Sequence, residues 1–80
     1  MNISQGVTKR ILELCIERKI TVNKLSTISG VTQSTVSDIV NSRAKNVGVV
    51  TIKKLCDGLE ISIYDFFDTD YFKTMEQELR

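Results

Sequence analysis

The chain has 80 residues, of which 41% are hydrophobic and 26% are charged, and a chain this short builds one core and one globular domain. It contains no histidine, and its two cysteines, Cys15 and Cys56, form no CxxC pair, so we expect neither a metal site nor a cofactor. The sequence also lacks a phosphate-binding glycine loop and paired carboxylates suited to a cleft, which argues against an enzyme.

The expected compartment follows from what the sequence lacks. It shows no signal peptide and no run of about 18 apolar residues, the minimum for a membrane span. We therefore expect a cytoplasmic protein without a membrane partner. In a reducing compartment Cys15 and Cys56 are expected to be reduced core residues, with a disulfide between them as the alternative.

The net charge is +1, but the charges are distributed unevenly along the chain. Residues 1–46 carry seven basic and three acidic side chains, a net +4, whereas residues 47–80 carry four basic and seven acidic ones, a net −3. This asymmetry is typical of a protein with one side directed toward a polyanion, although ordinary solvated surface charge produces the same pattern.

The apolar residues follow helical spacing almost throughout, so the predicted fold class is all-α. A first helix is expected from Ser4 or Gln5 to Lys19, with one apolar stripe formed by Val7, Ile11, Leu14 and Cys15. Lys9 and Arg10 are interpreted as ordinary surface charges.

Two short helices are predicted next. Thr21 is placed to cap the first of them, which Leu25 and Ile28 anchor in the core. Gly30 ends it, because glycine adopts a positive φ without steric cost. Thr32 caps the second, which buries Val36, Ile39 and Val40.

A loop is expected from Asn41 to Gly48, followed by a fourth helix from Val49 that Gly58 breaks or ends. The β-branched residues from Val47 to Ile52 leave a strand as the alternative. A fifth short helix begins at Ser62, where Asp65 completes a capping-box-like start, and carries Phe66 and Phe67.

The predicted domain spans residues 4–68 and leaves residues 69–80 as a C-terminal tail. The tail keeps helical spacing in Tyr71, Phe72, Met75 and Leu79, so it is either an amphipathic extra helix or a frayed end. The same four side chains either pack on their own domain or form a dimer contact.

Residues 22–41 carry the functional signal. Val36 and Ile39 hold the third helix, so its opposite side presents Ser34, Ser37, Asp38 and Asn41, with Gln33 in the exposed first turn. Ordinary solvated helices usually carry Lys and Glu there. The short or bidentate hydrogen-bonding groups found instead suit the edges of DNA bases.

The stretch from Ile11 to Phe67 resembles the Cro and phage-repressor helix-turn-helix family, also called the XRE family. The resemblance rests on the spaced residues Leu25, Gly30, Val31, Gln33, Val36, Ile39 and Asn41, on the segment from Asn46 to Leu55, and on the closing turn from Ile61 to Phe67. It implies a five-helix lambda-repressor-like DNA-binding domain whose recognition helix spans about residues 32–41.

The resemblance also implies roles for individual residues. Base-reading positions fall on Thr32, Gln33, Ser34, Ser37 and Asp38. Phosphate-contacting positions fall on Asn23, Asn41, Arg43, Lys45 and Asn46. The alternative is plain helix surface for the first group and solubility charges for Arg43 and Lys45.

The sequence departs from the family pattern at three places. Val22 stands where many relatives have a glutamine that steadies the first glutamine of the recognition helix. Cys15 and Val40 replace a buried Arg–Glu pair, an exchange that costs the fold little. Asp38 puts a negative charge on the DNA-facing side, where it accepts from cytosine, disfavours other sequences, or stays in water at the rim.

These observations predict a sequence-specific transcriptional regulator, a repressor that binds a double-stranded operator as a homodimer and needs no small-molecule effector. The alternative is a protein-interaction module, such as an antitoxin or regulatory adaptor with the same fold. Salt-dependent affinity for DNA separates the two, because only the regulator requires it.

Overall fold

The computed structural model describes residues 1–77, which form six helices and no strand. The helices are α1 (Ile3–Arg18), α2 (Val22–Ser29), α3 (Gln33–Val40), α4 (Val49–Leu59), α5 (Ile63–Phe67) and α6 (Asp70–Lys73). The all-α prediction is confirmed, and the strand alternative for residues 47–52 is wrong. None of the helices in residues 1–77 has the length and apolar character needed to cross a membrane.

At three of the predicted helix starts, a side-chain hydroxyl group caps the helix. The side chains of Thr21, Thr32 and Ser62 each accept a hydrogen bond from the backbone N–H three residues later, at 3.0, 3.3 and 2.9 Å. These bonds satisfy amides that have no partner inside the helix.

Helix α1 begins earlier than predicted. Its N-cap is Asn2, whose side chain accepts from the Gln5 backbone N–H, while the Gln5 side chain accepts from the Asn2 N–H. This reciprocal capping box uses Asn and Gln. The helix ends at Arg18, and Lys19 adopts a left-handed conformation with a φ of 55°.

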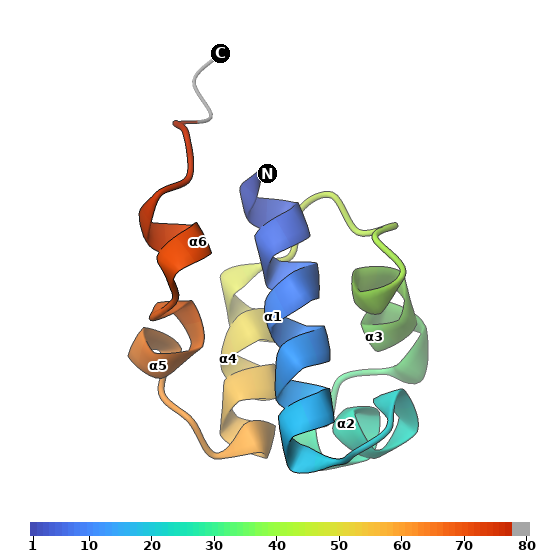
Figure 1. Ribbon diagram of the computed structural model, residues 1–80. Helices are drawn as coiled ribbons and strands as arrows, with labels where there is room; N and C mark the ends of the chain where they lie inside the picture. The colour runs from blue at the N-terminus through green and yellow to red at the C-terminus, as the bar shows by residue number, and fades with distance from the viewer. Residues whose placement is uncertain (78–80) are drawn as a thin grey trace.

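Helix α1 runs through the centre of the molecule, with α2 and α3 on one side and α5 and α6 on the other (Figure 1). It contacts α3 and α6, while α2 packs against both α3 and α4. The loop from α3 to α4 passes close to the N-terminal end of α1 in this view (Figure 1). The N-terminal half of α1 therefore lies between that loop and the C-terminal segment.

The core draws buried residues from α1 to α5. Its members are Val7, Ile11, Leu14, Cys15, Leu25, Val31, Val36, Ile39, Ile52, Leu55, Cys56, Leu59 and Phe66. Val40 is half-buried against this cluster, so Cys15 lies in the apolar core and Val40 packs against it. Burial raises the pKa of the Cys15 and Cys56 thiols, which keeps them protonated and poorly nucleophilic.

Two predictions about α2 and α4 are wrong, and both concern the contact between these helices. Gly58 neither breaks nor ends α4, which continues to Leu59 and is capped by Glu60 in a left-handed conformation. Ile28 is 37% exposed and does not belong to the core. A Cβ atom added at Gly58 would lie 2.8 Å from the Ile28 carbonyl oxygen and 2.8 Å from the Ser29 Cα. Gly58 is therefore the position where the backbone at the end of α2 approaches α4.

Replacing Gly58 by alanine tests this close approach. In most helix interiors glycine-to-alanine stabilises a protein by about 0.5–1 kcal/mol. Here the added methyl group meets backbone, so we expect Gly58→Ala to lower the free energy of unfolding by about 1–3 kcal/mol. Urea unfolding followed by circular dichroism measures the difference.

The matched comparison is Gly6→Ala, which also changes a helix-interior glycine. The three atoms nearest to a Cβ at Gly6 belong to the side chains of Met75 and Phe72, which can shift more easily than the backbone atoms that face Gly58. The loss should therefore be smaller than at Gly58. A Gly58→Ala protein as stable as the parent would show that α2 and α4 are not in close backbone contact.

Candidate nucleic-acid interface

The turn between α2 and α3 is fixed by hydrogen bonds on both sides of Gly30. Gly30 has a φ of 71°, and its N–H donates to the Ser26 carbonyl at 3.0 Å. The Ser26 hydroxyl then donates to the Val31 carbonyl at 2.6 Å. Val31 itself is buried. The polar bonds and the buried side chain together set the direction in which α3 leaves the turn.

Helix α3 buries one side and exposes the other. Val36 and Ile39 are 0% and 1% exposed. The five residues predicted to read bases lie outside this buried stripe, three of them exposed and two half-buried: Thr32, Gln33 and Ser34, then Ser37 and Asp38. Thr32 is also the N-cap, and its hydroxyl donates to the Thr35 hydroxyl at 2.9 Å.

A hydrogen-bonded network covers the C-terminal end of α3. The Asn41 Nδ2 donates to the Ser37 carbonyl at 2.9 Å and to the Ser37 Oγ at 3.2 Å. Arg43 donates through Nε to the Asp38 Oδ1 at 3.0 Å and through Nη2 to the Ser37 Oγ at 3.2 Å. Two predicted base-reading residues are thus joined to two predicted phosphate-contacting residues.

The backbone brings Arg43 back over α3. Ser42 adopts a left-handed conformation with a φ of 61°, which reverses the chain. The N–H groups of Arg43 and Ala44 then both donate to the Asp38 carbonyl, at 2.8 and 3.1 Å. Asp38 is therefore bonded to Arg43 through its backbone and its carboxylate, and the guanidinium offsets the negative charge that the sequence places on this surface.

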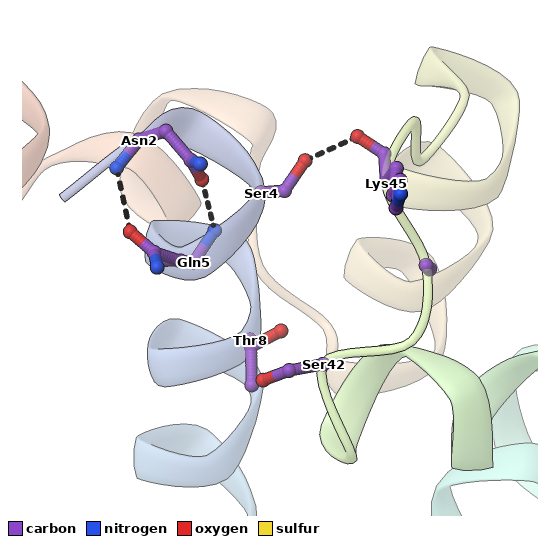
Figure 2. Close-up of a pocket in the computed structure, with 7 residues that line it drawn as sticks. Asn2, Ser4, Gln5, Thr8, Ser42 and Lys45 are labelled. Atoms are coloured by element: carbon purple, nitrogen blue, oxygen red, sulfur yellow. Dashed lines mark hydrogen bonds between the residues drawn. The ribbon is translucent and has the colours of Figure 1, made fainter.

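The loop after α3 is attached to α1. The buried Thr8 hydroxyl donates to the Ile39 carbonyl at 2.6 Å, and the Ser4 hydroxyl donates to the Lys45 carbonyl. Between these contacts lies a polar hollow of about 340 Å³. Figure 2 shows the N-cap Asn2 and the α1 residues Ser4 and Gln5 across the hollow from Lys45, with Thr8 and Ser42 at one end.

The remaining predicted phosphate-contacting residues have exposed side chains. Asn23 lies in the first turn of α2, and Lys45 and Asn46 lie in the loop before α4. Lys45 is held through its carbonyl by Ser4, which leaves its ammonium group in solvent. The predicted contacts thus come from two segments, one on each side of α3 in the sequence.

A family model described as the Cro/C1-type HTH DNA-binding domain matches residues 10–70. The chain belongs to this family. The match contains the whole of α2, α3, α4 and α5, and so confirms the resemblance seen in the sequence. The protein therefore carries a DNA-binding domain of the Cro/C1 type.

A solved structure supports the assignment of this Cro/C1-type domain. The crystal structure of the prophage Lp1 protein 11 is 32% identical in sequence and superimposes with a TM-score of 0.80. The similarity covers 92% of this chain and 97% of that chain. No curated protein sequence matches this chain at a significant level.

Arg10 has a structural role in this Cro/C1-type domain that its interpretation as surface charge missed. Its Nε donates to the Phe66 carbonyl at 2.7 Å, and its Nη2 donates to the Asp65 carbonyl at 2.8 Å. Both carbonyls lie at the C-terminal end of α5, where the Asp65 carbonyl also accepts from the Asp68 N–H at 3.3 Å. Residue spacing contains no direct signal for this contact, because the partners are backbone atoms more than fifty residues away.

The C-terminal segment of the Cro/C1-type domain packs on α1. Phe72 packs against the core, and the Met75 side chain approaches Gly6 closely. The Tyr71 hydroxyl donates to the Glu13 Oε1 at 2.8 Å, and the Lys9 Nζ lies 4.6 Å from the centre of the Tyr71 ring. Leu79 lies outside the described residues. A dimer contact through Tyr71, Phe72, Met75 and Leu79 stays a prediction.

The ionisation of Tyr71 reports whether α6 is held on α1. Burial, and then the hydrogen bond to Glu13, raise the pKa of Tyr71 to about 12. The chain has two tyrosines, so in a Tyr64→Phe variant the tyrosinate absorbance belongs to Tyr71 alone. We expect that absorbance to titrate with a midpoint of about 12.

The raised pKa also predicts how stability changes with pH. Because the folded state holds this proton more tightly than the unfolded state, the contribution of Tyr71 is present below pH 10 and is lost as the pH approaches about 12. Tyr71→Phe should remove this part of the pH dependence. A tyrosinate midpoint near 10 would show instead that the hydroxyl is solvated and that α6 is not bonded to Glu13.

Proposed function

We propose that the protein is a sequence-specific transcriptional regulator that reads the major groove of operator DNA with α3. The outward side of this helix supports the proposal, because it carries short polar groups and one glutamine above a fully buried apolar stripe. Gln33 is exposed, and within residues 1–77 its side chain makes no hydrogen bond. An amide that can donate and accept together matches the N6 and N7 atoms of adenine.

Phosphate groups beside the groove are the proposed ligands of Asn23, Lys45 and Asn46. All three side chains are exposed. Asn23 lies in the first turn of α2, and the other two lie in the loop before α4. Lys45 contributes a charge, whereas the two asparagines contribute hydrogen bonds that position the domain without releasing counterions.

We further propose that the protein acts as a homodimer on a pseudo-palindromic operator and that it represses transcription. One small domain reads few base pairs and binds weakly alone. Two half-sites combine their affinities when their centres lie about 34 Å apart or a multiple of that. Repression is the simplest result of such binding, because an occupied operator excludes other proteins from the same DNA.

Selection of bound sequences from random DNA, followed by titrations at several salt concentrations, tests the proposal. We expect a symmetric preferred sequence and an affinity that falls linearly with salt on logarithmic axes. A protein-interaction module with this fold would show neither. Binding that depends on salt but has no preferred sequence would exclude base reading by α3.

Gln33 gives the sharpest mutational test of base reading. Gln33→Ala should weaken binding to the preferred operator by about 1–3 kcal/mol and relax the choice of base at one position in each half-site. Binding to random DNA should barely change, because Gln33 is neutral and releases no counterion. Fluorescence anisotropy with both DNAs measures the two affinities.

Gln77→Ala is the matched control, since it makes the same chemical change at an exposed position in the C-terminal segment. It should leave both affinities unchanged. For Gln33→Ala itself, the loss of operator affinity should lie toward the lower end of its range, because Val22 leaves Gln33 without a neighbouring glutamine. If Gln33→Ala loses equal affinity for operator and random DNA, Gln33 does not read a base.

A further inference from the structure

The network at the end of α3 determines what Ser37 can offer to a ligand. A serine hydroxyl has one hydrogen to donate and two lone pairs that accept. At Ser37 two donors already face the oxygen, the Asn41 Nδ2 at 3.2 Å and the Arg43 Nη2 at 3.2 Å. With both lone pairs engaged, the group that Ser37 has left is its O–H donor.

The same network fixes what Asp38 offers. An ionised carboxylate can only accept hydrogen bonds, and the Arg43 Nε donates to its Oδ1 at 3.0 Å. The second oxygen remains available as an acceptor. The guanidinium also offsets the carboxylate charge, which would otherwise repel the phosphates of a bound duplex.

We propose that Arg43 is a positioning residue that fixes the hydrogen-bonding polarity of Ser37 and holds the Asp38 carboxylate in place with one oxygen free, an inference that rests on the function proposed above. Ser37 is then a donor, matched to guanine N7 and O6, adenine N7 or thymine O4 in the major groove. Asp38 is an acceptor, matched to the amino group of cytosine or adenine. Arg43 acts through these residues, and a contact with phosphate is not its main role.

Exposure of the ion pair determines where its effect appears. The Arg43 and Asp38 side chains are 58% and 47% exposed, and a pair in water contributes little to the stability of the free protein. When DNA covers α3, water leaves the site and the same interaction strengthens. Loss of Arg43 should therefore change base preference while leaving thermal stability unchanged.

The experiment compares Arg43→Ala, Ser37→Ala and Asp38→Asn with Lys45→Ala as the matched loss of a loop cation. Each protein is titrated with every single-base variant of the selected operator, and the salt dependence and melting temperature are measured as well. Ser37→Ala and Asp38→Asn identify the base positions that these two residues read. Arg43→Ala should change preference by about tenfold at those positions only.

Two further readouts separate positioning from charge. The slope of log affinity against log salt should be unchanged in Arg43→Ala, whereas Lys45→Ala should lower it by about 1 and weaken all sequences alike. Adding Arg43→Ala to an Asp38→Asn, Ser37→Ala background should have little further effect on preference, because residues that act as a unit are not additive.

Three outcomes would count against the inference. If Arg43→Ala reproduces Lys45→Ala, Arg43 is a phosphate contact. If it leaves both preference and slope unchanged while the parent binds specifically, the network does not serve recognition. If the parent protein shows no salt-dependent, sequence-specific binding, the proposed function fails and the role of Arg43 fails with it.

Discussion

Helix α3 has eight residues, too few for a helix to be stable alone in water, so its existence and its direction depend on what it buries. Val36 and Ile39 lie in the core, and the Thr8 hydroxyl on α1 holds the Ile39 carbonyl at 2.6 Å. With the inner side fixed in this way, the outer side has one orientation. Gln33, Ser34 and Ser37 need no packing partner of their own, which leaves them free to be chosen for hydrogen bonding.

Signals carried by neighbouring residues predicted most of the fold. Thr21, Gly30 and Thr32 act within three or four residues of themselves, so their roles as caps and turn could be inferred from the sequence. Gly58 acts on the backbone of α2, a helix it meets only in the folded protein. A glycine within a helix therefore resembled a helix end, and sequence spacing contained nothing to distinguish the two.

In the candidate site, too, local features could be predicted from the sequence and contacts made through the fold could not. Which residues lie on the outer side of α3 follows from helical spacing, and those positions were predicted. Their hydrogen-bond partners were not, because the Asp38–Arg43 pair requires the left-handed conformation of Ser42. Serine adopts that conformation rarely, and nothing in its neighbourhood indicated it. The sequence therefore showed Asp38 as an uncompensated charge and Arg43 as a loop cation, whereas the chain reversal makes them one unit.

Helix α1 separates the loop after α3 from the C-terminal segment. One side of its N-terminal half holds the loop after α3 through Thr8 and Ser4, and Gly6 receives Phe72 and Met75 of the C-terminal segment. Figure 1 shows α3 and α6 on opposite sides of α1. A contact made beyond α6 would therefore leave the outer side of α3 uncovered. Both attachments lie on the same half of α1, whose capping box at Asn2 and Gln5 resists fraying at that end.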